Sequence, residues 1–235
     1  MLRISQLHGF NAIPSAASAG TTPGNPDHAW RFESAPNTLV DVVAGDDFTQ
    51  FGSPSTDNGI NGQCIKFTSV SQYLTESNAI SASEFSICGW FQVGHIAGGS
   101  TRFTPARIVN GGALVSFEVV SYGSGVWEAD LINEGTSETG SLSDLYSNQW
   151  NFFCLIRKTD TSLVLHVNDE VLTHPDAMAV DGDVIEINSG SAGVSGGDLM
   201  MVDEYYLFDG ELSAAQVSWL YNGGTGRFVD GSGQF

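Results

Sequence analysis

Residues 84–93, EFSICGWFQV, decide the class of fold. The stretch alternates between two sets of side chains that are both largely apolar: Phe85, Ile87, Gly89, Phe91 and Val93 on one face, and Ser86, Cys88, Trp90 and Gln92 on the other. A strand that is apolar on both faces is typical of the centre of packed sheets. The stretch therefore predicts a central strand that is covered on both sides.

Similar short runs lie on both sides of this stretch, separated by clusters of Gly, Asn, Asp and Ser. Two neighbouring pairs predict hairpins: 113–120 with 126–132, and 149–158 with 163–169. Further strand-like runs are 28–33, 38–43, 62–68, 184–187 and 199–208. Many short strands with such turn signals favour an all-β fold, an antiparallel two-sheet β-sandwich or jelly roll.

Residues 213–224, SAAQVSWLYNGG, break the strand pattern and predict a short helix. Ser213 and Gln216 match a capping box, and Gly223 supplies the stop at the other end. We expect this C-terminal helix to lie on the outside of a sheet or across one end of the sandwich. Trp219 would anchor it, and Trp90 and Trp150 would belong to the core.

The charge balance excludes two classes of partner. The 235 residues carry 27 Asp and Glu against 8 Lys and Arg, a formal net charge of −19. Nucleic acids and anionic membrane surfaces both need a basic face, so neither is expected to bind. With 41% hydrophobic and 15% charged residues, the chain is expected to form a packed core with its acids in loops.

Residues 1–26 are expected to form an extended N-terminal arm that precedes the sandwich of residues 27–235. The arm is rich in Ala, Ser, Gly, Thr and Pro and offers little apolar surface to bury, so it would order against a partner. It has no apolar core of the length of a signal peptide. Cys64, Cys88 and Cys154 are expected to be buried free thiols; one pair could form a disulfide, which the sequence does not choose. These features indicate synthesis in a reducing cytoplasm.

Four stretches in order resemble the laminin G-like jelly-roll domains of the concanavalin A-like lectin/glucanase superfamily. They are 60–74, 84–93, 149–172 and 202–224, and the resemblance spans about residues 28–228. The resemblance implies the same sandwich fold. It leaves the function open, because members bind sugars or proteins, hydrolyse glycans or serve as structural pieces.

The acidic residues do not match the needs of a glycoside hydrolase of this fold. The resemblance implies a Glu-x-Asp-x-Glu strand, and the nearest match is Glu128, Asp130 and Ile132, where an aliphatic residue replaces the third acid. Asp203 and Glu204 are adjacent, so in a regular strand they would point to opposite faces. We therefore expect a protein that is not an enzyme, with the hydrolase as the least favoured alternative.

Candidate binding residues follow from the same patterns. Trp127, Tyr122 and Tyr146 lie near loop-like sequence and could stack on sugar rings, although packing in the core is the alternative for Trp127. The resemblance also implies a structural Ca²⁺ near the N-terminal and closing strands, with Asp41 and Asp203 as the first choices of ligand.

A single sandwich with an arm and without a secretion signal favours a virion protein. We expect a phage capsid decoration or tail-fibre protein, made in the host cytoplasm, attached through residues 1–26 to other capsid or tail proteins and forming a homo-oligomer. The alternative is a carbohydrate-binding, lectin-like adhesion module that recognises a cell-surface glycan.

Overall fold

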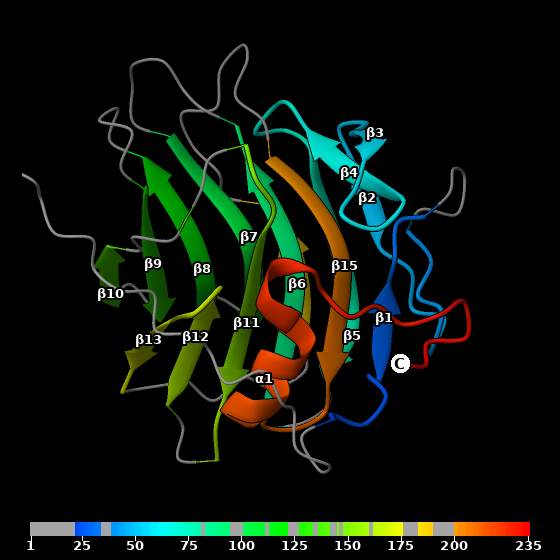
Figure 1. Ribbon diagram of the computed structural model, residues 1–235. Helices are drawn as coiled ribbons and strands as arrows, with labels where there is room; N and C mark the ends of the chain where they lie inside the picture. The colour runs from blue at the N-terminus through cyan, green and yellow to red at the C-terminus, as the bar shows by residue number, and fades with distance from the viewer. Residues whose placement is uncertain are drawn as a thin grey trace, which may run out of the picture.

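The structure, a computed structural model, is an antiparallel sandwich of two curved sheets (Figure 1). It describes residues 22–33, 39–80, 83–94, 101–110, 113–121, 127–133, 136–141, 145, 148–159, 162–175, 183–189 and 200–235. The all-β two-sheet prediction is confirmed, together with both predicted hairpins. Residues 1–21 of the expected arm lie outside the described ranges.

The first sheet has eight strands. Their order is β13 (Glu170–His174), β12 (Leu163–Val167), β11 (Asn151–Arg157), β6 (Phe85–Val93), β15 (Met200–Phe208), β4 (Gln63–Phe67) and β3 (Ser55–Asn58), with β1 (His28–Trp30) paired to β15. The second sheet has seven strands: β10 (Thr136–Ser141), β9 (Trp127–Asn133), β8 (Ala113–Ser121), β7 (Thr101–Asn110), β14 (Asp183–Ile187), β5 (Tyr73–Ile80) and β2 (Thr49–Phe51).

Strand β6 lies in the middle of the eight-stranded sheet and is buried on both faces, as its sequence predicts. Phe85, Ile87 and Phe91 point into the main core between the two sheets. Cys88 and Trp90 point to the opposite face, where they belong to a second apolar cluster. The second cluster exists because another layer covers the outside of this sheet.

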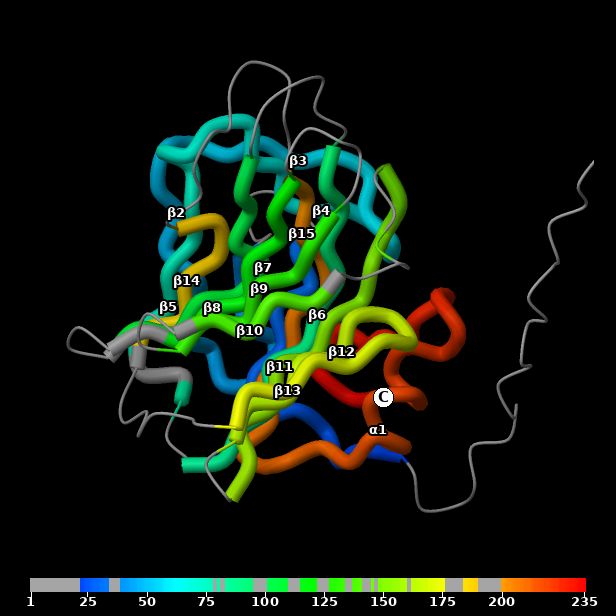
Figure 2. The backbone as a smooth tube through the Cα atoms, turned by 90° about the vertical axis from the view of Figure 1, so that its left-hand side faces the viewer, coloured from blue at the N-terminus to red at the C-terminus, as the bar shows by residue number. Residues whose placement is uncertain are grey.

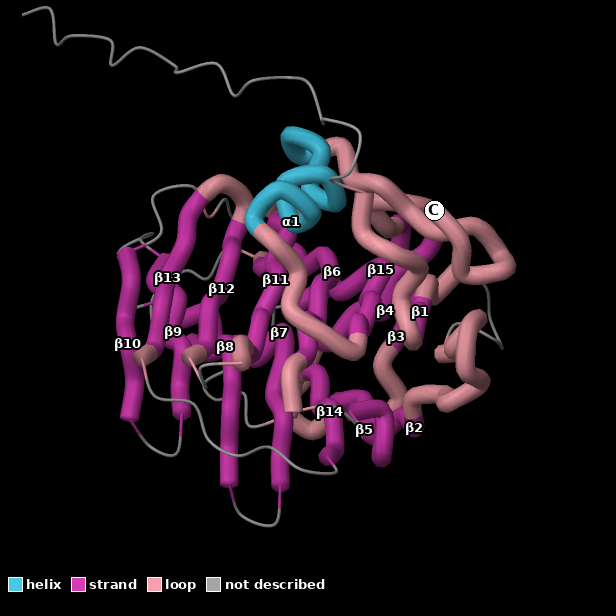
Figure 3. The backbone as a smooth tube through the Cα atoms, turned by 90° about the horizontal axis from the view of Figure 1, so that it is seen from below, coloured by secondary structure: helices cyan, strands magenta, loops and turns pink. Residues whose placement is uncertain are grey.

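That outer layer consists of helix α1 (Ala214–Tyr221), the 3₁₀ turn Asn222–Gly224 and the chain that follows. Figures 2 and 3 show it on the side of the eight-stranded sheet that faces away from the seven-stranded sheet. Ser213 and Gln216 form the predicted capping box, and Val217 and Leu220 are buried against the sheet. No helix among the described residues is long and apolar enough to cross a membrane.

Two of the three cysteines follow the alternative that the sequence left open, a single disulfide, rather than the expected free thiols. Cys88 and Cys154 are directly opposite each other on β6 and β11 and form a disulfide. Cross-strand neighbours bring side chains close enough to bond, a relation that is visible only once the two strands are paired. Cys64 is a buried free thiol, as expected.

Candidate functional site

A β-bulge in β15 places two acids on the same side of the sheet. Met200, Val202, Tyr205 and Leu207 point into the main core, whereas Tyr206 belongs to the outer cluster. Glu204 is the extra residue: its φ is +52°, and the pairing with β6 shifts register between Asp203 and Tyr206. The expectation that Asp203 and Glu204 point to opposite faces is therefore wrong, because the bulge interrupts the alternation.

Asn61, in the turn between β3 and β4, bonds to both acids. Its backbone N–H donates to Asp203 Oδ2 at 3.2 Å, and its side-chain Nδ2 donates to Glu204 Oε1 at 2.9 Å. The hydroxyl of Tyr206 donates to Glu204 Oε2. Arg31 Nε lies 3.7 Å from Glu204 Oε1, which provides partial charge compensation. The two acids, both fully buried, thus form one hydrogen-bonded group with Asn61.

Burial favours the uncharged form of both carboxyl groups. It raises the pKa of Asp203 to about 9, with a further contribution from the charge of Glu204. Burial also raises the pKa of Glu204 to about 7, opposed by the hydrogen bonds from Tyr206 and Asn61 and by the charge of Arg31. Asp203 Oδ1 is buried without a hydrogen-bond partner among the described residues. A carboxylate oxygen of this kind, beside a second carboxylate, is a ligand that Ca²⁺ binds.

Asp41, the other expected calcium ligand, is occupied by protein donors. Its Oδ1 accepts the backbone N–H groups of Ala29 and Val43, and its Oδ2 lies 2.8 Å from His28 Nδ1. The ligand atoms of His28, Asp41 and Asp46 lie within 4.8 Å of one another. A cation at Asp41 would have to displace these donors, so the geometry fits a structural ion pair better than a calcium site.

These bonds also explain why the strand predicted at 38–43 is wrong. Of the described residues 39–43, only Asp41 forms an isolated bridge, with Trp30. The Asp41 carboxylate binds neighbouring backbone N–H groups, which competes with the ladder of a regular strand.

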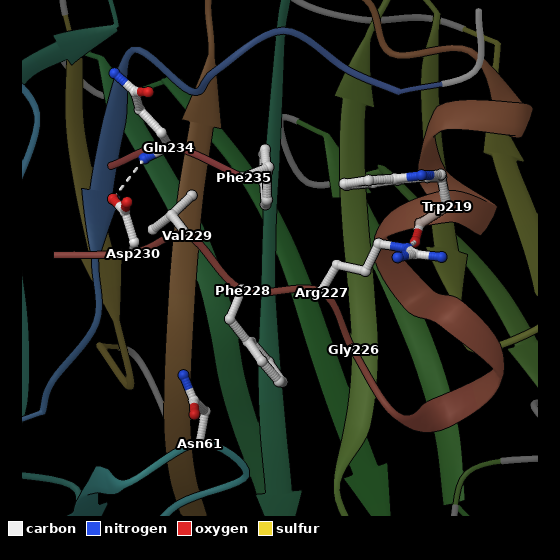
Figure 4. A pocket seen from close by; sticks show the side chains of 9 residues that line it. All are labelled: Asn61, Trp219, Gly226, Arg227, Phe228, Val229, Asp230, Gln234 and Phe235. Carbon is white, nitrogen blue, oxygen red and sulfur yellow. Dashed lines mark hydrogen bonds between the residues drawn. The ribbon is translucent and has the colours of Figure 1, made fainter. Parts of the chain in front are cut away.

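An open pocket of about 650 Å³ lies on the outer layer (Figure 4), and Asn61, which bonds to the two buried acids, is one of its lining residues. Its walls come from the C-terminal segment, from α1 and from the turn that holds Asn61. Four partly buried side chains give it a mixed apolar and polar character: Trp219, Arg227, Phe228 and Phe235. The remaining lining residues are Asn61, Gly226, Val229, Asp230 and Gln234.

The aromatic walls of the pocket hold one another in place. The Phe235 ring packs edge-on against Trp219 at 5.4 Å and against Tyr206 at 5.6 Å. The Arg227 guanidinium lies 4.5 Å from the centre of the Trp219 ring, and its Nε donates to the Trp219 carbonyl at 3.1 Å. The backbone N–H of Val229 donates to Tyr206 Oη at 3.4 Å, which ties the segment to β15.

Of the residues expected to bind sugar, Trp127 lies in the described ranges, and it does not line this pocket. Trp127 is only 4% exposed and packs against Phe103 in the main core, so its ring face is not available for stacking. The core alternative is the correct one for Trp127. Tyr122 and Tyr146 lie outside the described residues. Of the expected core residues, Trp90 is buried and Trp150 packs partly buried against the outer cluster.

The strand considered for catalysis contributes to a different cluster. Asp130 on β9 lies directly opposite Glu118 on β8, and Arg102 on β7 contacts both carboxylates, with Nη1 3.0 Å from Glu118 Oε2 and Nη2 4.0 Å from Asp130 Oδ2. Burial raises the pKa of Glu118, a shift that the charge of Arg102 opposes. Sequence reasoning missed Glu118 because cross-strand partners cannot be read from spacing.

Solved structures of other proteins share the fold of this chain. The chain is similar to the receptor binding domain of botulinum neurotoxin C/D mosaic serotype, with a TM-score of 0.63, 16% identity, and coverage of 85% of this chain and 51% of that one. For the binding domain of Paraclostridial Mosquitocidal Protein 1 the values are 0.64, 12%, 89% and 55%. A structure concerning botulinum neurotoxin type C, whose cell entry depends on interaction with two ganglioside molecules, gives 0.60, 16%, 84% and 51%.

The fold is a concanavalin A-like jelly roll. The chain spans about half the length of the chains that it resembles, and identities of 12–16% show the fold alone. No protein-family model matches the sequence, and no curated protein matches it. The resemblance found in the sequence is thus confirmed at the level of the fold, while its phage connection has no counterpart in these similar structures.

Proposed function

We propose that this protein is a non-catalytic carbohydrate-binding module and that its binding site is the pocket between α1, the C-terminal segment and Asn61. The observation that carries the proposal is the lining: the aromatic rings of Trp219, Phe228 and Phe235 stand beside the polar groups of Asn61 and Gln234. Aromatic faces bind the apolar face of a sugar ring, and nearby polar groups bind its hydroxyls. The volume of about 650 Å³ lies in the range of small-ligand pockets.

The similar structures support a binding role over a catalytic one. One is the receptor binding domain of a neurotoxin, and another is the binding domain of a mosquitocidal protein. A third concerns a neurotoxin whose cell entry depends on gangliosides, which carry sugars. These relations favour the lectin-like alternative drawn from the sequence over the virion role.

A glycan array with the intact protein tests the proposal. We expect binding to a defined group of saccharides, and a loss of about tenfold in affinity in Phe228→Ala, because packing against one aromatic ring contributes about 0.5–1.5 kcal/mol beyond the apolar area that it buries. Phe51→Ala is the matched control, since Phe51 is 40% exposed on β2 and stacks on Tyr73 in the other sheet. Absence of binding to any saccharide, or loss in Phe51→Ala but not in Phe228→Ala, would contradict the proposed site.

We also propose that Asp203 binds a structural Ca²⁺. Asp203 Oδ1, which has no hydrogen-bond partner among the described residues, would be the ligand, and a bound cation would offset the burial of this acid. Such an ion would hold the turn that carries Asn61, and therefore one wall of the pocket.

Attachment to a virion through residues 1–26 and assembly into a homo-oligomer stay predictions from the sequence. A pull-down of candidate capsid and tail proteins by the full chain, compared with a chain that lacks residues 1–26, tests the attachment. Equal capture by the two chains would contradict it.

A further inference from the structure

Arg227 is held in one orientation at the edge of the pocket. Its backbone N–H donates to the Leu220 carbonyl at 3.0 Å, its Nε donates to the Trp219 carbonyl at 3.1 Å, and its guanidinium lies over the Trp219 ring. These contacts use the backbone, the Nε and the ring-facing side of the guanidinium. Arg227 lines the pocket, and its two terminal nitrogens have no hydrogen-bond partner among the described residues, which leaves these donors available to a ligand.

The absence of an acidic partner sets Arg227 apart in this strongly acidic chain. Five other bases of the described part of the chain each have a carboxylate within 4.0 Å: Arg31, Lys66, Arg102, Arg107 and Lys158. Arg157 is buried and donates to the Ser83 carbonyl. Within the described ranges, Arg227 has no such ion pair, although the chain carries 27 acids for 8 bases.

The charged groups of the pocket are separated. Asp230 and Gln234 lie at the opposite end from Arg227 and Trp219, with Phe228 and Phe235 between them (Figure 4). Asp230 Oδ1 is engaged in its own turn by Ser232 and by the Gln234 backbone N–H. Asn61 bonds to the buried Asp203 and Glu204, and Arg31 partly offsets the charge of Glu204. A ligand that spans the pocket therefore meets a cation at one end and hydrogen-bonding groups at the other.

We propose that the pocket binds an acidic saccharide, with its carboxylate or sulfate group on Arg227, a sugar ring against the aromatic side chains between the two ends, and hydroxyls toward Asn61 and Gln234. This inference rests on the proposed carbohydrate-binding function and names the class of sugar. The planar guanidinium suits the paired oxygens of such anions. A local cation is also required, because the net charge of −19 repels anions from the rest of the surface.

The test uses an array with carboxylated, sulfated and neutral saccharides, followed by calorimetry of the intact protein with the best acidic saccharide and its neutral counterpart. We expect preferential binding of acidic saccharides, and in Arg227→Gln a loss of about tenfold or more for the acidic sugar with little change for the neutral one. Because Arg227 also packs on Trp219, a second variant is needed that leaves these contacts intact.

Asp230→Asn is that variant, since Asn keeps the acceptor for Ser232 and Gln234 but removes the acid from the pocket. We expect a gain of about two- to fivefold in affinity for the acidic sugar and none for the neutral sugar. Preference for neutral sugars, or equal effects of both variants on both sugars, would overturn the acidic-sugar inference and leave the proposed function standing. Absence of binding to every saccharide would overturn both.

Discussion

Asn61 and Glu204 are 143 residues apart in the chain, and the side-chain amide of Asn61 donates to Glu204 Oε1 at 2.9 Å. The same Asn61 lines the pocket. One short turn between β3 and β4 therefore serves two purposes: it satisfies a buried acid and forms a wall that a ligand would touch.

Replacing Asn61 tests the first of these purposes. We expect Asn61→Ala to lower the free energy of unfolding by about 1–3 kcal/mol, because Glu204 loses a buried hydrogen-bond donor. Urea denaturation measures the change. Asn58→Ala is the control, since Asn58 is exposed on β3 of the same hairpin. Equal stability of the two variants would show that the bond to Glu204 contributes nothing.

Calcium should stabilise the protein through Asp203. We expect added Ca²⁺ to raise the thermal midpoint of the wild type, and Asp203→Asn to abolish that shift. Without Ca²⁺, Asp203→Asn should be at least as stable as the wild type near neutral pH, because burial raises the pKa of Asp203 to about 9 and the acid must take up a proton on folding, a cost that an amide avoids.

The control for the calcium experiment is Asp209→Asn, which removes an exposed acid just beyond the end of β15. NaCl should raise the midpoint of all three proteins alike, because it screens the net charge of −19 without occupying a site. A calcium shift that persists in Asp203→Asn would contradict the site.

The sequence predicted the layers of this fold much better than its site. The alternation of β6 and the capping box at Ser213 are local patterns, and each was confirmed because buried faces and helix caps depend on neighbouring residues. The Cys88–Cys154 pair and the Glu118–Asp130 pair depend on strand register, which spacing alone does not reveal.

The pocket was not predicted for a similar reason. Asn61, Trp219 and Phe235 come together only because the chain after α1 folds back across the outer face of the sheet. The bulge at Glu204 was missed because its positive φ falls on a residue type that rarely adopts one. The sequence did contain a signal, because two adjacent acids lie in the apolar run 199–208. Burial of that run raises the pKa of both acids.

The ion pair of His28 and Asp41 should make stability depend on pH. Burial of His28 opposes its charge, but the bond to Asp41 and the charges of Asp41, Asp46 and Glu76 outweigh burial and raise the pKa of His28 above 6.5. Burial of Asp41 is likewise outweighed by bonds from His28, Ala29 and Val43, which lower its pKa below 3.8. The pair is thus fully formed between pH 3.8 and 6.5.

We expect wild type to exceed His28→Gln in unfolding free energy by about 1–3 kcal/mol near pH 5. This difference should shrink as the pH rises through the raised pKa of His28, because His28 then loses its charge. It should also shrink as the pH falls through the lowered pKa of Asp41, because Asp41 then becomes protonated. Denaturant titrations from about pH 3 to 9 measure both trends. His166→Gln is the contrasting variant, because burial lowers the pKa of His166. The wild type should lose unfolding free energy relative to His166→Gln as the pH falls below about 6.5, whereas it should gain unfolding free energy relative to His28→Gln as the pH falls to about 6.5 through the raised pKa of His28. A difference independent of pH would refute the ion pair.

The Tyr205 side chain packs directly against Gly89, which has no side chain of its own. A Cβ at Gly89 would lie 2.5 Å from Tyr205 Cδ2, and the fully buried Tyr205 is fixed by its hydroxyl, which donates to the Pro105 carbonyl at 2.9 Å. We expect Gly89→Ala to lower the free energy of unfolding by about 1–3 kcal/mol through overpacking. Gly24→Ala is the control, since a Cβ at Gly24 would meet no described atom within 4 Å. Equal denaturation midpoints would contradict this packing.

Strand β15 also sets the order of events when the chain is made. It lies between β6 and β4 and pairs with β1, so the middle of the eight-stranded sheet is filled by residues 200–208. A ribosome must therefore synthesise residues 200–208 before the sheet can close, and β1, β4 and β6 expose unpaired edges until then. Folding of the sheet should be slow, and chains that end before residue 200 should aggregate rather than fold in part.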